Sequence, residues 1–140
     1  MSCKADHITA LVTVPALRGK GRPRHNSWGT YTDPKDRLYE ADIRRQFMDQ
    51  IGEQFRYFTG PVHVALEFTR PLPKSYPKKR NGEADTAKPD VDNLAKSVLD
   101  ALSGVAWRDD SQVTVLKAEK KPRWHGAPNT ILIDITYWEE

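Results

Sequence analysis

The chain has 140 residues and a single cysteine, so it can bury the core of one domain but can form neither an internal disulfide nor a cysteine-based zinc cluster. Its net charge is only +3, but basic residues crowd into 18–25 and 73–80, which favours binding of a polyanion. The amino-terminal run is too polar for a signal peptide and no stretch is long and apolar enough to span a membrane, so we expect a soluble, cytoplasmic protein.

The first part of the chain predicts a strand, a basic loop and a helix. Residues 8–14 are apolar and β-branched up to Pro15, which is typical of a strand. A loop with several glycines and basic residues follows over 15–32. Asp33 and Pro34 then form a helix start, after which apolar residues recur every four positions along a helix of about five turns. This apolar face consists of Tyr39, Ile43, Phe47, Ile51 and Phe55.

The middle of the chain predicts a second strand, a long loop and a second helix. Residues 62–70 alternate between apolar and polar, so one face of this strand is buried. Prolines and basic residues fill 71–89 without periodicity, and we expect a long, mobile loop there. The helix expected over 92–105 has one apolar face and ends at Gly104. Its opposite face carries Asp92, Lys96 and Asp100.

The last part of the chain predicts two strands. One covers about 112–120, after an acidic turn at 109–111, and the other covers 130–138. Together the elements predict one α+β domain over 1–140, in the order β-α-β-α-β-β. We expect a mixed sheet of about four strands with the two main helices packed on one face.

Two aspartates, Asp90 and Asp92, lie at the start of the second helix. Asp92 can cap the free N–H groups of the first turn, but capping does not explain Asp90 two residues upstream. Two such like charges are tolerated where solvent screens them and become useful where a divalent cation bridges them. The alternative for this helix face is an exposed ladder of salt bridges around Lys96, worth roughly 0.2–0.5 kcal/mol per pair.

A third carboxylate is expected to join this pair. Asp109 and Asp110 precede the strand that follows the helix, and a strand returning alongside the helix can bring Asp110 near Asp90 and Asp92. Such a site would hold one or two Mg²⁺ ions, activate a water and stabilise a breaking phosphodiester. Lys96 would donate to a phosphoryl oxygen or to the leaving oxygen.

The stretch KPDVDNLAKSVLDALSGVAWRDDSQVTVLKAEKK, residues 88–121, closely resembles the core of the RusA-type Holliday junction resolvases of bacteria and their phages. The shared pattern is D-x-D-N-x-x-K, an Asp within the helix, a small residue and Gly near its end, and D-D-x-Q before a strand that ends in lysine. GKGRPR and the YTDP helix start are also similar, so the resemblance covers nearly the whole chain. It implies a Mg²⁺-dependent, structure-selective endodeoxyribonuclease, with Mn²⁺ as a substitute metal, that acts as a homodimer on four-way DNA junctions.

The resemblance also assigns roles to single residues. Asp90, Asp92 and Asp110 match the metal-binding, catalytic aspartates of the family, and Lys96 matches its essential lysine. The secondary candidates are Asp109 and Asp100.

A homodimer suits such a substrate, because a four-way junction has approximate two-fold symmetry and a C2 dimer presents two identical sites to a symmetric pair of strands. Exposed apolar residues of the first helix or of the strands are candidates for its interface.

Two basic loops, 15–32 and 71–89, are expected to grip the DNA backbone without reading its sequence. Some family members carry a basic residue directly before the first aspartate, where this chain has Pro89, with Lys88 one position earlier. The alternative is that both loops are ordinary solvent-exposed loops, rich in lysine and arginine, that do not bind DNA. The four tryptophans could stack on bases, although core or edge packing is their more common role. The expected DNA-binding residues are Lys20, Arg22, Arg24, Lys78, Lys79, Arg80 and Lys88.

Two other functions stay open at this point. A non-catalytic junction-binding or DNA-binding module would keep binding after the metal is chelated and would cut no strand. Another kind of metal-dependent phosphoesterase would prefer a flap, other branched DNA or a small nucleotide to a four-way junction.

Overall fold

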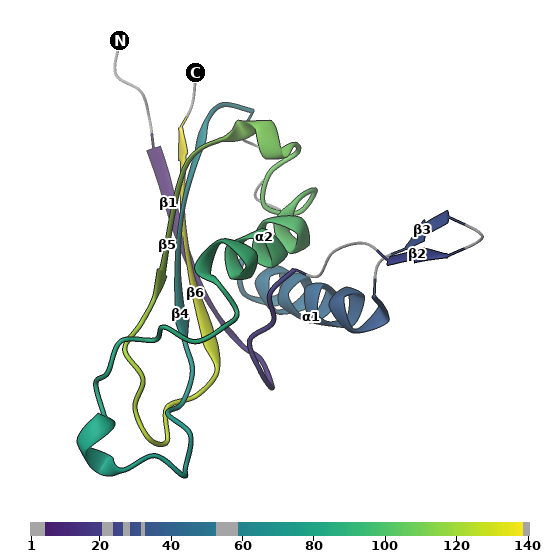
Figure 1. The fold of residues 1–140 in the computed structure, drawn as a ribbon. Coiled ribbons are helices and arrows are strands. Elements are labelled where there is room, and N and C mark those ends of the chain that lie inside the picture. Colours follow the sequence, from purple (N-terminus) through teal and green to yellow (C-terminus); the bar gives the residue numbers. More distant parts are fainter. Residues whose placement is uncertain (1–4, 21–23, 27–28, 32, 53–58, 139–140) are drawn as a thin grey trace.

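The computed structural model describes residues 5–20, 24–26, 29–31, 33–52 and 59–138. Within these residues it contains a four-stranded mixed sheet, a two-stranded hairpin and two α-helices (Figure 1). Neither of these helices is long and apolar enough to span a membrane. The strands are β1 (Ala5–Thr13), β2 (Arg24–Asn26), β3 (Gly29–Tyr31), β4 (Val62–Thr69), β5 (Val113–Lys120) and β6 (Thr130–Trp138). The helices are α1 (Pro34–Ile51) and α2 (Val91–Leu102), with 3₁₀ turns η2 (Lys78–Arg80) and η3 (Asp110–Gln112).

The main sheet has the strand order β1-β6-β4-β5. β6 pairs antiparallel with β1 and with β4, whereas β4 and β5 are parallel. Figure 1 shows α1 and α2 on the same side of this sheet. The predicted α+β architecture is therefore confirmed.

The core lies between the sheet and the helices. β4 alternates between buried and half-buried residues as predicted, and β6 follows the same pattern, because successive side chains of a strand point to opposite faces. The inward residues of these two strands are Val62, Val64, Leu66, Phe68, Ile131, Ile133, Ile135 and Tyr137. From the helices they are covered by Tyr39, Ile43, Phe47, Leu94, Val98, Ala101 and Leu102. Phe55, predicted for the same helix face, lies outside the described residues.

The parallel pairing of β4 with β5 determines the direction of α2. A chain that leaves the end of one parallel strand must cross back to the start of the next, and the loop after β4 together with α2 makes this crossover. The beginning of α2 therefore lies at the carboxyl ends of both strands, where Lys120 Nζ donates to the Pro89 carbonyl (3.0 Å). Its end lies toward their amino ends, where Gln112 Nε2 donates to the Gly60 carbonyl (3.1 Å).

The two basic loops have more structure than the sequence indicates. The loop over 15–32 contains the β2–β3 hairpin, which was not predicted. The segment 71–89, expected to be irregular and mobile, contains η2 and forms isolated bridges from Pro71 to Trp124 and from Glu83 to Arg123. Sequence patterns miss such bridges because they join positions that are distant in the chain.

Candidate active site at the start of α2

Two exposed aspartates, Asp90 and Asp92, lie at the start of α2. Leu94 N–H donates to the Asp90 carbonyl (3.0 Å), so the helix begins earlier than predicted, and Asp90, not Asp92, occupies the N-cap position. The prediction that Asp92 is the cap is thus wrong, and the Asp90 side chain makes no capping hydrogen bond either. Within the described residues, neither carboxylate has a hydrogen bond or an ion pair. Both therefore keep their lone pairs available for a cation.

Lys96 lies one turn beyond Asp92 on the same exposed face of α2. Its ammonium has no ion pair in the described part of the chain, and Asp100 pairs instead with Lys20 (3.1 Å). The salt-bridge ladder considered as the alternative is therefore not formed. A shallow hollow of about 370 Å³ separates this face from β5; its lining is Val91, Asp92, Ala95, Lys96, Leu99, Leu116 and Ala118.

Asp109 and Asp110 lie near the opposite end of α2. Trp107 is fully buried there and its Nε1 donates to Asp110 Oδ1 (2.8 Å), so the tryptophan anchors the acidic turn. Asp109 caps η3, because its carboxylate accepts the Ser111 N–H (3.0 Å). Both aspartates are exposed.

The three predicted metal ligands Asp90, Asp92 and Asp110 do not converge within one chain, so the expectation of a single pocket formed by all three in one chain is wrong. α2 has 12 residues and, at a rise of about 1.5 Å per residue, is about 18 Å long, and the two acidic groups lie near its opposite ends. Among the described residues, no group of three His, Cys, Asp or Glu side chains is arranged to hold a metal. The reason is the crossover: the residues before the helix and those before the next parallel strand lie at opposite ends of the sheet.

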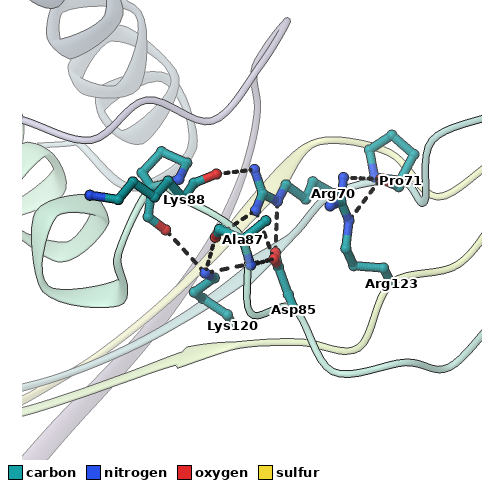
Figure 2. A network of polar contacts seen from close by, with 8 residues as sticks. Arg70, Pro71, Asp85, Ala87, Lys88, Lys120 and Arg123 are labelled. Atoms are coloured by element: carbon teal, nitrogen blue, oxygen red, sulfur yellow. Dashed lines mark hydrogen bonds and ion pairs between the residues drawn. The ribbon is translucent and has the colours of Figure 1, made fainter.

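A polar network holds the segment that leads into Asp90 (Figure 2). Asp85 accepts two hydrogen bonds from Arg70, both 2.7 Å, and its Oδ1 lies 3.6 Å from Lys120 Nζ. Burial raises the pKa of Asp85, but the hydrogen bonds and charge of Arg70, with the charges of Lys120 and Arg123, outweigh burial and lower the pKa below its usual value. Asp85 is therefore ionised at neutral pH.

A second contact holds the helix start from the side of the first basic loop. Lys20 N–H donates to the Asn93 carbonyl (3.1 Å), and a Cβ added to Gly19 would lie only 3.0 Å from Pro89 Cβ. Glycine at position 19 thus permits the close approach of the two segments, where a Cβ would make an unusually tight contact. The ammonium of Lys20 pairs with Glu40 (2.8 Å) as well as with Asp100, so it is engaged within the chain.

Comparison with known proteins places this chain in a family. The family model described as Endodeoxyribonuclease RusA matches residues 15–136, which is most of the chain. The chain belongs to the RusA family. It is also 37% identical over 115 residues to the uncharacterized protein YqaN of Bacillus subtilis (strain 168), an alignment that covers 72% of this chain and 78% of the relative.

In this RusA-family chain the predicted DNA-binding residues are in different situations. Lys78, Lys79 and Lys88 are exposed. Arg80 pairs with Glu83, with two contacts of 2.8 and 2.7 Å. Arg22 and the side chain of Arg24 lie outside the part of the chain that the structure describes.

The tryptophans also differ. Trp107 is too deeply buried to stack on a base, whereas Trp124 is half exposed over Gly82. Trp138 is half-buried against His63, and Trp28 lies outside the described residues.

Sequence reasoning missed Arg70 and Asp85 altogether, because nothing in their local patterns separates them from ordinary surface charges. Lys120 was visible only as the lysine that ends the RusA-like strand pattern, with no role attached. Gly19 was visible as part of GKGRPR, but the close approach to Pro89 that it permits depends on the fold.

Proposed function

We propose that this protein is a Mg²⁺-dependent endodeoxyribonuclease that resolves four-way DNA junctions by paired, symmetric nicks. Membership in the RusA family supports the reaction class. The observation that carries the proposal is the start of α2, where Asp90 and Asp92 have no cation partner among the described residues and Lys96 lies one turn away.

The residues present fit a hard divalent cation. Asp90 and Asp92 offer carboxylate oxygens exposed to water, the donor set that Mg²⁺ prefers and that Mn²⁺ also accepts. When bound, the ion would provide Lewis-acid chemistry, which activates a water nucleophile and stabilises charge on the phosphodiester. Lys96 donates to a phosphoryl oxygen or the leaving oxygen as negative charge develops there. The positive end of the α2 dipole attracts the same phosphate.

In this proposal each active site contains residues from both chains of a homodimer. Two carboxylates from one chain provide few ligands for the ion, and Asp110 of the same chain lies about one helix length away. We therefore assign the third carboxylate to the partner's Asp110. A two-fold axis makes this exchange reciprocal, so both sites are completed at once.

β5 offers a surface for such an association. It lies at the edge of the sheet, pairs only with β4 among the described strands and exposes Val115 and Leu116. Antiparallel pairing of two β5 strands would put the start of one beside the end of the other. Because Asp110 precedes β5 and Lys120 at its end contacts the segment before Asp90, this pairing brings the partner's Asp110 toward Asp90.

The exposed cations of the second basic loop then hold the DNA backbone beside the site. Lys78, Lys79 and Lys88 have ammonium groups at the surface of the segment that leads to Asp90. Contacts of this kind release counterions, so junction affinity should fall steeply as salt increases.

The decisive test is a labelled synthetic four-way junction incubated with Mg²⁺ or EDTA. We expect paired nicks from wild type with Mg²⁺, and a loss of roughly 10²–10³-fold in cutting for Asp90→Asn and for Lys96→Ala. Both variants should still bind the junction. Matched controls on α1 are Asp49→Asn and Lys35→Ala, which change exposed residues of the same type and should cut like wild type.

Each other outcome has a distinct meaning. Wild-type cutting by Asp90→Asn would refute the metal site. Binding without cutting under either Mg²⁺ or Mn²⁺ would identify a non-catalytic junction-binding protein. Faster cutting of a flap, duplex or nucleotide than of the junction would identify another phosphoesterase.

A further inference from the structure

Three successive carbonyl groups just before Asp90 are held by two cationic side chains (Figure 2). Arg70 donates to the carbonyls of Ala87 and Lys88, both at 3.0 Å. Lys120 donates to the carbonyls of Ala87 (2.6 Å) and Pro89 (3.0 Å). The path of the backbone into the active-site helix is thus determined by side chains that come from elsewhere in the fold.

The two cations start from fixed points. Arg70 directly follows β4, Lys120 ends β5, and the register of these strands pairs Phe68 with Lys120. Asp85 lies between the cations with its side chain only 2% exposed, and its two bonds to Arg70 fix the plane of the guanidinium. The ends of two sheet strands therefore set the position of the residues before Asp90.

We propose that Arg70, Asp85 and Lys120 form a positioning clasp that holds the Asp90 carboxylate where it binds the cation. This inference rests on the proposed function of Asp90 and Asp92 as metal ligands. Groups behind the ligands of a metal site orient those ligands, and a displacement of about 1 Å at a catalytic ligand is enough to impair it.

The clasp residues position the site and do not contact the substrate. The side chains of Arg70 and Lys120 are 14% and 11% exposed, and their donors are directed to Asp85 and to backbone carbonyls. Lys88 behaves differently: its side chain extends away from the clasp in Figure 2, and it is exposed. The clasp thus holds the Lys88 carbonyl and leaves the Lys88 ammonium for DNA.

The first test measures the clasp in the metal-free protein without DNA. Lys120→Met keeps the length of the side chain and removes its donors, and we expect faster amide hydrogen exchange at Leu94 to Lys96, the first amides of α2 that donate helical hydrogen bonds. The matched control is Lys121→Met, the adjacent lysine, whose ammonium is near the exposed Glu67 and Glu119 and not near the helix start. Exchange at 94–96 in the control should equal that of wild type.

The second test measures the metal dependence of junction cutting. For Lys120→Met the Mn²⁺ or Mg²⁺ concentration that gives half-maximal cutting should rise about 10- to 100-fold, while junction affinity in EDTA stays at the wild-type value. Lys120→Arg keeps cationic donors and should restore most of the wild-type metal dependence. Arg70→Lys, which loses the two-bond contact with Asp85, should be intermediate, and it replaces Lys120→Met if that variant does not fold.

The outcomes separate the clasp from the proposed function. A wild type that cuts no junction with any divalent cation overturns the nuclease proposal, and with it the role of the clasp at a metal site. A wild type that cuts, together with a Lys120→Met variant whose exchange at 94–96 and metal dependence match Lys121→Met, overturns the clasp alone.

Discussion

Asp85 shows how burial and charge compete at a single residue. Burial raises its pKa, but Arg70, Lys120 and Arg123 more than reverse this, so its pKa is lower in the folded chain than in the unfolded chain. Such a group stabilises the fold above its unfolded pKa of about 3.9. That stabilisation is lost as the pH falls below about 3.9 and through the folded pKa.

We therefore expect the Tm of the wild-type protein to have an acid-dependent component below about pH 4 that Asp85→Asn lacks. At neutral pH, Asp85→Asn should lower the free energy of unfolding by roughly 3–5 kcal/mol, because it leaves two cations without their shared anion. Thermal melts of both proteins from about pH 2.5 to about pH 7 check this. Parallel Tm curves for the two proteins would contradict the assignment.

Gly19 is a second position where one atom matters. In Gly19→Ala the new Cβ would lie 3.0 Å from Pro89 Cβ and 3.1 Å from Asn93 Cβ, and both atoms are attached directly to backbone. We expect a loss of roughly 1–3 kcal/mol in the free energy of unfolding and slower junction cutting, because the start of α2 must shift. Urea unfolding and cutting assays measure both effects. Ala16→Ser adds one atom to an exposed residue of the same loop and should leave both unchanged.

At the scale of elements, Lys20 links the two helices. Its side chain is 17% exposed, and its ammonium contacts Glu40 of α1 and Asp100 of α2. Burial lowers the pKa of Lys20, but the hydrogen bonds and charges of these two carboxylates outweigh it and raise the pKa. This environment indicates a structural role for a lysine that the sequence predicts to bind DNA.

Lys20→Ala and Lys79→Ala should therefore have opposite effects. Lys20→Ala removes the tie between α1 and α2, so its Tm should fall while its junction affinity stays near the wild-type value. Lys79→Ala removes an exposed charge, so the Tm of this variant should stay constant while its affinity for the junction falls. The slope of log affinity against log salt concentration should also decrease by about one, which corresponds to the loss of one phosphate contact. Thermal melts and fluorescence anisotropy with a labelled junction measure both. A Lys20→Ala variant with unchanged Tm and weakened binding would restore the DNA-binding role.

At the scale of the whole molecule, the proposed function makes the activity depend on two chains, because Asp110 is separated from Asp90 within one chain. Purified heterodimers of Asp90→Asn with Asp110→Asn test this directly. If Asp110 acts across the dimer, both substitutions fall in one site and the other site is intact, so the heterodimer should nick single strands at about half the wild-type rate. Each homodimeric variant should be inactive.

The reverse pairing is the control for this experiment. A chain with both substitutions, combined with a wild-type chain, places one substitution in each shared site and should be inactive. If this pair is the active one and the first pair is not, Asp110 serves its own chain, and our assignment of the third carboxylate is wrong.

The elements of this fold could be predicted from the chain because their signals are local. The alternation over 62–70, the four-residue repeat from Tyr39 and the amphipathic helix after Asp90 each record which side faces the core. The order of these elements was enough to predict a mixed sheet with helices on one face. The motif around Asp90, Asp92 and Lys96 was likewise readable, because its members lie within two helical turns.

The placement of distant groups could be decided only by the tertiary structure. Whether Asp110 returns to Asp90 depends on the direction of a helix between two parallel strands, and no local pattern encodes that direction. The clasp is invisible for the same reason, because Arg70, Asp85 and Lys120 come from a strand end, a loop and a second strand end that meet only when β4 and β5 pair. Local periodicity follows from the geometry of one element, whereas a site built from several elements depends on how they pack.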